Sequence, residues 1–223
     1  MEEGFFTRKL EIGSCGKSLT LFQKEVGDVS CVVWDAALVL AKYLEVRCGK
    51  TQNWLRGQSV VELGAGLGCV GLTAACFGAN VTMTDLPEVM PLLQKNVDAN
   101  QAVWRSCGGK VSTQVLQWGS EIQDWKTPDV LVLADCVYYM ESVEPLVNTL
   151  CCLTDDNTEV IISQEERDTE KQRIVWKVFR DMLQSHFEVM NVLEKELHPD
   201  FCSVDIVVLR AVKRPHFNKV HLI

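Results

Sequence analysis

Apolar and polar positions follow two alternating periods along most of the chain. Short apolar runs predict strands over residues 59–63, 80–84, 111–117, 129–134 and 160–163. Apolar residues at helical spacing predict helices over residues 35–45, 69–77, 87–100, 143–151 and 169–185. This alternation predicts an α/β protein whose mostly parallel sheet carries helices on both faces.

Both ends of the chain depart from the alternation. Two strand-like runs within residues 7–25 surround a turn-forming sequence at 13–17, which predicts a short β-hairpin. Residues 187–193 and 204–212 predict two further strands with no helix between them, and so an antiparallel hairpin on the otherwise parallel sheet. We therefore divide the chain into an N-terminal β-hairpin extension, residues 1–30, and one α/β domain, residues 31–223.

The composition is that of an acidic globular chain. Its 223 residues carry a formal net charge of −8, which disfavours broad binding to nucleic-acid phosphates. No apolar run reaches the roughly 20 residues that span a bilayer, and the first residues lack a secretory signal pattern. The ten cysteines contain no C-x-x-C pair, and no Cys/His spacing fits a zinc site. We expect reduced thiols, a cytoplasmic or also nuclear location, no metal, no nucleic-acid or membrane partner, and a monomer.

The most informative stretch is the strand that runs into a glycine-rich turn at residues 60–68. Gly64 and Gly66 allow a tight turn and let a ligand approach the backbone without meeting a Cβ atom. Cys69 stands where a dinucleotide-binding loop has its third glycine. The acidic Glu62 opposes a pyrophosphate but suits the cationic ammonium group of S-adenosylmethionine. The loop therefore favours S-adenosylmethionine, with a dinucleotide and a ligand-free packing turn as the alternatives.

A second cofactor contact is predicted at the end of the next strand. Asp85 lies where a carboxylate can accept hydrogen bonds from both ribose hydroxyls. It can also cap the following helix, whose first turn we place at Pro87. Leu86, next to Asp85, is predicted to line the same site.

The methyl group is expected to be transferred where the strand ending at Ala134 leads into Asp135. A lysine amine is protonated at neutral pH, so its site must hold the cation, let it lose a proton and exclude water. Asp135 can orient the ammonium group, and Tyr138 and Tyr139 can form an aromatic wall against it. The alternative is that the tyrosines are packing residues with polar tips. The strand end lacks the Pro-Pro pair typical of nucleic-acid amine methyltransferases.

Four separated motifs agree in order with one known family. They are Val33-Trp34-Asp35-Ala36-Ala37, the loop from Glu62 to Gly68, Leu116-Gln117-Trp118-Gly119, and the strand end from Ala134 to Tyr139. On these motifs the chain resembles the methyltransferase-like 21 group of non-SET protein-lysine methyltransferases. The resemblance implies a class I, seven-stranded, Rossmann-like methyltransferase fold. It also implies S-adenosylmethionine as methyl donor and S-adenosylhomocysteine as product.

The resemblance further implies roles for single residues. Trp34 would close over the cofactor and Trp118 would lie beside its adenine. The other implied cofactor contacts are Gly64, Ala65 and Gly66 for the methionine part, Asp85 for the ribose, and the backbone of Ala134. Asp135 and Tyr138 stand in a D-x-x-Y motif that serves the substrate lysine.

The expected substrate is valosin-containing protein, a hexameric AAA ATPase. The resemblance implies this substrate through the runs Cys31 to Asp35, Leu116 to Ile122, Ala134 to Tyr139, and Ser203 to Ile206. Gln164 departs from the family pattern, which has an aromatic residue there, so the lining of the lysine channel is open. The alternatives are a lysine of another chaperone or elongation factor, a non-catalytic S-adenosylmethionine-binding adaptor, and a nicotinamide oxidoreductase.

Overall fold

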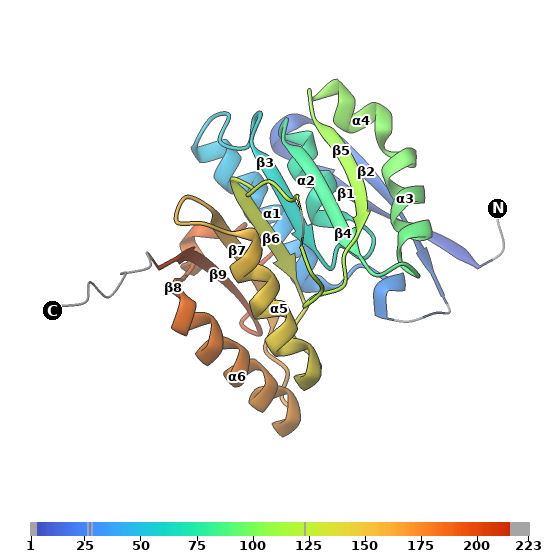
Figure 1. The fold of residues 1–223 in the computed structure, drawn as a ribbon. Helices are drawn as coiled ribbons and strands as arrows, with labels where there is room; N and C mark the ends of the chain where they lie inside the picture. Colours follow the sequence, from blue (N-terminus) through green and yellow to red (C-terminus); the bar gives the residue numbers. More distant parts are fainter. Residues whose placement is uncertain (1–3, 26, 28, 123, 215–223) are drawn as a thin grey trace, which may run out of the picture.

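The centre of the molecule is a seven-stranded sheet with the strand order β5-β4-β3-β6-β7-β9-β8 (Figure 1). The computed structural model describes residues 4–25, 27, 29–122 and 124–214. The strands are β3 (Ser59–Leu63), β4 (Asn80–Asp85), β5 (Lys110–Val115), β6 (Val130–Ala134), β7 (Glu159–Glu165), β8 (Phe187–Asn191) and β9 (Ile206–Lys213). β9 runs antiparallel to both β7 and β8, whereas β5, β4, β3, β6 and β7 pair in parallel. This layout confirms the predicted class I methyltransferase sheet with its C-terminal hairpin.

Helices cover both faces of the sheet (Figure 1). They are α1 (Asp35–Lys50), α2 (Cys69–Cys76), α3 (Met90–Ala99), α4 (Gln101–Ser106), α5 (Met140–Leu153) and α6 (Glu170–His186). One hydrophobic cluster contains buried residues of α1 to α4, and a second contains those of α5 and α6. The chain reverses its direction of travel across the sheet between β3 and β6, and in such sheets a ligand crevice opens at this point.

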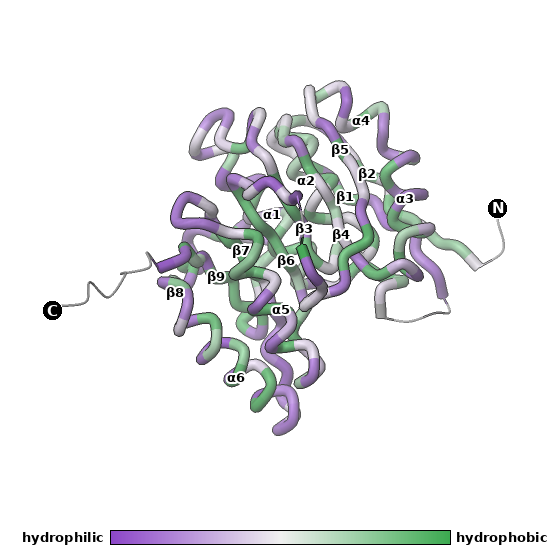
Figure 2. The backbone as a smooth tube through the Cα atoms, viewed as in Figure 1, coloured by the Kyte–Doolittle hydropathy of each residue, from purple (hydrophilic) through white to green (hydrophobic). Residues whose placement is uncertain are grey.

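The strand β6 shows why a nearly continuous apolar run is needed at the centre. Val130 and Val132 belong to the cluster under α1 and α2, whereas Leu131 and Leu133 belong to the cluster under α5 and α6. Successive side chains of a strand point to opposite faces, so a strand covered on both faces has no position for a polar residue. Figure 2 shows the central strands as the green, hydrophobic interior of the molecule.

The helix after β4 differs from the prediction. Pro87 lies in a turn closed by a hydrogen bond from the Val89 N–H to the Leu86 carbonyl, and α3 begins only at Met90. Pro91 takes the position in the first helical turn where a missing N–H costs nothing. The short helix α4 was not predicted. Its six residues are too few for a clear period.

The N-terminal hairpin is part of the same packed unit as the sheet. Its strands β1 (Phe5–Ile12) and β2 (Lys17–Lys24) pair antiparallel, as predicted. Asn96 of α3 and Asn100, which follows that helix, exchange hydrogen bonds of 2.7–3.1 Å with the backbone of Phe22 and Thr20. Each amide side chain offers a donor and an acceptor, so it makes the two hydrogen bonds that a neighbouring strand would otherwise make with β2. Gln23 accepts a hydrogen bond from the Val33 N–H at 2.8 Å, which fixes the segment leading to Trp34.

Candidate active site

A cleft of about 720 Å³ opens at the carboxyl ends of β3, β4 and β6. This is the lower edge of the sheet in Figure 1. All twelve site residues predicted from the sequence line this one cleft. They are Trp34, Glu62, Gly64, Ala65, Gly66, Asp85, Leu86, Trp118, Ala134, Asp135, Tyr138 and Tyr139. The fold therefore brings the predicted residues together, and their individual roles stay predictions.

The glycine loop after β3 forms the floor of the cleft. Gly64 and Gly66 have φ angles of +61° and +52°, in the left-handed region that favours glycine. A Cβ atom on Gly64 would lie 2.8 Å from Cys136 Sγ and 3.2 Å from the Trp118 ring. Only glycine therefore lets these two side chains approach the backbone at this point.

The carboxylate of Asp85 holds the same loop from the side. Its Oδ2 accepts a hydrogen bond from the Gly66 N–H at 2.7 Å, and its Oδ1 accepts one from the Leu86 N–H at 2.8 Å. Each carboxylate oxygen can accept more than one hydrogen bond, and Asp85 lies in the lining of the cleft. These acceptors suit a vicinal diol such as a ribose.

Glu62 is buried under the loop and turned toward the N-terminus of α2. Its Oε2 accepts a hydrogen bond from the Gly71 N–H at 2.8 Å, and only 3% of the residue is exposed. A Cβ atom on Gly71 would lie 2.5 Å from that oxygen, so this glycine, which we did not predict, allows the contact. Burial, together with a smaller contribution from the negative Asp85, raises the pKa of Glu62 to about 8. The group therefore holds a proton at neutral pH unless a cation lies beside it.

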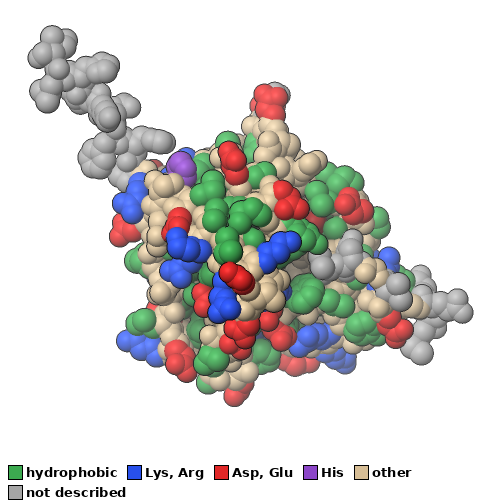
Figure 3. Space-filling view, turned by 90° about the horizontal axis from the view of Figure 1, so that it is seen from below, with side chains coloured by type: hydrophobic (Ala, Val, Ile, Leu, Met, Phe, Trp, Pro, Cys, Tyr) green, Lys and Arg blue, Asp and Glu red, His purple; other side chains and the backbone are tan. Residues whose placement is uncertain are grey.

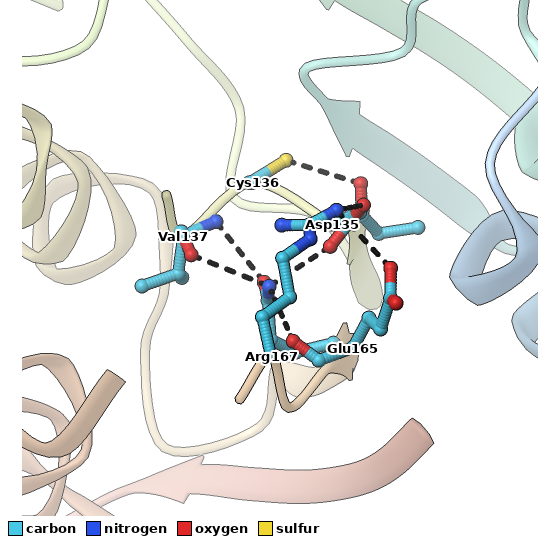
Figure 4. A network of polar contacts seen from close by, with 7 residues as sticks. Asp135, Cys136, Val137, Glu165 and Arg167 are labelled. Atoms are coloured by element: carbon cyan, nitrogen blue, oxygen red, sulfur yellow. Dashed lines mark hydrogen bonds and ion pairs between the residues drawn. The ribbon is translucent and has the colours of Figure 1, made fainter. Parts of the chain in front are cut away.

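Asp135 is the buried carboxylate at the end of β6. Its φ angle is +54°, a left-handed conformation that Asp tolerates better than most side chains. Its Oδ1 accepts a hydrogen bond from Gln164 at 2.9 Å, and its Oδ2 pairs with Arg167 at 2.5 Å (Figure 4). Burial raises the pKa of Asp135, and the Arg167 guanidinium opposes that shift. The carboxylate is thus desolvated and already paired with a cation.

Gln164 supports the loop after β6 from beneath. Its Oε1 accepts a hydrogen bond from the Val137 N–H at 3.0 Å, while its Nε2 reaches both Asp135 and the Val137 carbonyl. Only 1% of Gln164 is exposed, and it is not among the residues that line the cleft. The difference from the expected aromatic residue therefore changes the support of the Asp135 loop, not the wall of the cleft.

Aromatic side chains form the walls and rim of the cleft. The rings of Tyr138 and Tyr139 meet edge to face, with centroids 4.6 Å apart. Burial raises the pKa of Tyr138 to about 12, so its phenol stays neutral. Tyr139 is 49% exposed and Trp34 is 38% exposed, and both therefore lie at the mouth. The guanidinium of Arg167 lies 5.5 Å from the centre of the Trp34 ring.

The size, lining and surroundings of the cleft bear on what it can hold. Its volume lies in the range of small-molecule sites, and its lining combines apolar walls with a few convergent acceptors. Figure 3 views the molecule from the side of the strand ends and shows apolar, acidic and basic side chains mixed on this face. In the described part of the chain, no group of three His, Cys, Asp or Glu side chains is arranged to bind a metal ion. No helix in that part is long and apolar enough to cross a bilayer.

Comparisons with known proteins agree with this geometry. The family model described as lysine methyltransferase matches residues 14–185. Protein N-lysine methyltransferase METTL21A of Danio rerio is 38% identical over 187 residues, which cover 83% of this chain and 78% of that protein. The METTL21A of Xenopus tropicalis is 36% identical, with 76% and 73% covered. EEF1A lysine methyltransferase 3 of Xenopus tropicalis is 31% identical, with 82% and 78% covered.

Solved structures agree on the fold. The 16S rRNA N2 G1207 methyltransferase of T. thermophilus, solved with AdoMet and guanosine, superposes with a TM-score of 0.66 at 19% identity. The match covers 95% of this chain and 51% of that one. The glycopeptide N-methyltransferase MtfA complexed with S-adenosylmethionine gives a TM-score of 0.56 at 14% identity, with 78% and 94% covered. Both proteins share the class I sheet with this chain.

Proposed function

We propose, from the premise that this chain belongs to the lysine methyltransferase family, that it methylates a lysine side chain of valosin-containing protein. The chain is an S-adenosylmethionine-dependent protein-lysine methyltransferase. The observation that carries the proposal is the buried Asp135 carboxylate beside the Tyr138 ring, at the edge of the glycine-loop cleft. A negative group and an aromatic face at that position suit a primary ammonium ion.

The cofactor half of the cleft fits S-adenosylmethionine, which supplies the methyl group on its sulfonium when bound. The backbone of the glycine loop, which carries no side chain at Gly64 and Gly66, lines the cleft where the methionine part would lie. Asp85 offers acceptors for the ribose hydroxyls, and Trp118 offers an apolar surface for the adenine. Glu62 would place a negative charge near the methionine ammonium, and that cation would favour loss of its proton.

The substrate half would orient the lysine amine. Asp135 accepts hydrogen bonds from the ammonium group, which fixes the direction of the nitrogen and favours a single approach line. The Tyr138 ring and its neighbour Tyr139 form an apolar side that excludes water around the amine. The ammonium group would lose its proton to solvent water, and the residues around it would then hold the nitrogen lone pair in line with the methyl group that S-adenosylmethionine supplies when bound. The site thus contributes by positioning and desolvating the lysine amine, and not by covalent catalysis.

Support for valosin-containing protein comes from a resemblance to the family member that methylates it. Four runs carry that resemblance: Cys31 to Asp35, Leu116 to Ile122, Ala134 to Tyr139, and Ser203 to Ile206. A second candidate substrate is EEF1A, because relatives at 31% and 35% identity are EEF1A lysine methyltransferases. We expect the enzyme to act as a monomer in the cytoplasm or nucleus.

The substrate is tested by incubating the enzyme with radiolabelled S-adenosylmethionine and equal amounts of hexameric valosin-containing protein, EEF1A and a cytosolic chaperone. The proposal expects label on valosin-containing protein and at least tenfold less on the others. The Asp135→Asn variant, which keeps the shape of the side chain, is the matched control for enzyme-dependent transfer. Label confined to EEF1A or to the chaperone would replace the proposed substrate.

A further inference from the structure

Arg167 covers the carboxylate that is proposed to receive the substrate. The side chain of Asp135 is 4% exposed, and that of Arg167, which pairs with it at 2.5 Å, is 21% exposed. Figure 4 shows the Arg167 side chain reaching Asp135. The guanidinium also lies over the Trp34 ring, with its central carbon 5.5 Å from the ring centre. A cation that pairs with Asp135 beside an aromatic ring has the chemistry expected of the substrate ammonium group.

Arg167 also stands between two cavities. One is the cleft, which Asp135 lines. The other is a neighbouring groove of about 560 Å³ beside α6, which is lined by Glu165 and by acidic and basic side chains along most of that helix. Arg167 lines both, and its guanidinium lies 3.2 Å from the Glu165 carboxylate. The Glu165 side chain is 38% exposed, so the groove offers Arg167 a second, better solvated partner.

We infer that Arg167 is a displaceable stand-in for the substrate lysine. In the free enzyme its guanidinium keeps Asp135 paired and oriented. When the lysine side chain enters, its ammonium group takes the place on Asp135, and Arg167 moves into the groove while keeping its pair with Glu165. Arg167 is thereby a positioning and specificity-determining residue. This inference rests on the proposed function, because it takes Asp135 as the acceptor of the lysine.

The exchange avoids a buried charge without a partner. An unpaired carboxylate in a desolvated site is costly, and in practice it takes up a proton instead. Replacing one cation by another keeps Asp135 paired while the substrate binds, whereas a neutral side chain does not supply the charge that leaves with the guanidinium. Two charged groups act on Asp135: Arg167, which lowers its pKa, and Glu165 of β7, which raises it. Cys136 and Tyr138 of its own loop are the ionisable groups next along the chain, and burial raises the pKa of both.

The pH profile of kcat/KM for Arg167→Met tests the inference. The substrate is whichever of the three candidate proteins (valosin-containing protein, EEF1A or the chaperone) the wild type methylates. Loss of the guanidinium removes the opposing charge, so the acidic limb should move up by about one pH unit or more. We expect kcat/KM to fall most on the acidic side of the profile and to reach or exceed the wild-type value as the pH rises, because Asp135 ionises there and the competing cation is gone. Arg167→Lys should stay close to the wild-type profile. An equal loss at every pH would mean a structural role only and would overturn the inference.

Glu165→Gln tests the second half of the exchange. Without its second partner, Arg167 is held by Asp135 alone, so KM for the protein substrate should rise about fivefold while kcat and cofactor affinity stay near wild type. An unchanged KM would remove the displacement step. If the wild type methylates none of the proteins, the proposed function fails. The resting pair of Arg167 with Asp135 is then tested separately by carboxyl ¹³C NMR of the free enzyme, in which Arg167→Met must raise the pKa of Asp135.

Discussion

The two halves of the cleft are held in shape by different means. The cofactor half is built from backbone: two glycines at positive φ, and N–H groups that donate to Asp85 and Glu62. The substrate half is built from side chains, because Asp135 is fixed by Gln164 and Arg167 of another strand and its following loop. The difference shows where specificity can vary. A site formed by backbone atoms keeps its shape, and therefore its cofactor, when side chains elsewhere are substituted. A network of side chains changes its geometry whenever one member is replaced.

The comparison predicts that damage to either half leaves the other intact. Asp135→Asn should break the substrate half most severely, with kcat lowered about a hundredfold or more, because the amide cannot accept and orient an ammonium group as the carboxylate does. The dissociation constant for S-adenosylmethionine, measured by calorimetry, should stay within about twofold. A weakened cofactor affinity of the same size as the loss in kcat would show that the two halves are not separate.

Gly64→Ala should break the cofactor half. The added Cβ meets Cys136 Sγ at 2.8 Å, and the alanine must hold a φ angle of +61°. We expect cofactor affinity to fall about thirtyfold. Gly57→Ala is the matched control, because that glycine also has a positive φ, +76°, but its Cβ would meet no atom within 4 Å. Equal effects of the two substitutions on cofactor binding would mean that backbone strain alone, and not the close packing of the loop, is responsible.

The buried Glu62 should make both stability and cofactor affinity depend on pH. Its pKa in the folded protein is about 8, above its ordinary value of 4.5, so the folded state holds a proton that the unfolded chain has lost. The free energy of unfolding should therefore decrease as the pH rises from about 4.5 to 8. A bound methionine ammonium favours the ionised form, so affinity for S-adenosylmethionine should rise roughly tenfold between pH 6.5 and 8. Calorimetry on Glu62→Gln should find both dependences flattened, and persistence of the affinity change in that variant would assign it to another group.

Gln164→Met should give the smallest effect. The methionine fills the same volume but leaves the Val137 N–H without its acceptor, at a cost of about 1–3 kcal/mol in the free energy of unfolding. With the Asp135 loop less firmly held, kcat should fall about threefold to fivefold while cofactor affinity stays constant. Urea unfolding and steady-state kinetics measure the two quantities. A variant as stable and active as the wild type would show that the loop is held by β6 and β7 alone.

The cofactor half of this site could be predicted from sequence because its signals are local. The bounds of β3 were predicted to the residue, and the glycine loop and Asp85 follow their strands directly. Arg167 and Gln164 could not be assigned to the substrate half in this way. They lie 32 and 29 positions from Asp135 and reach it only because Ala134 of β6 pairs with Ser163 of β7. A buried polar residue at the end of an apolar strand was the available signal, and its partner depended on the sheet register.

The fold was predicted well for the same reason, and its errors lie where a local signal is ambiguous. The alternation of strands and helices and both hairpins were confirmed. The predicted start of α3 was wrong because two prolines, Pro87 and Pro91, each fit a first helical turn. Only the turn closed at Val89 decides between them.

The most direct test is peptide mapping of hexameric valosin-containing protein by mass spectrometry after incubation with S-adenosylmethionine and either the wild type or Asp135→Asn. With the wild type, we expect one lysine to gain the mass of one, two or three methylene units. We expect no gain with the variant, although the variant still binds the cofactor. Methylation by both enzymes would contradict the role of Asp135, and methylation by neither would contradict the proposed substrate.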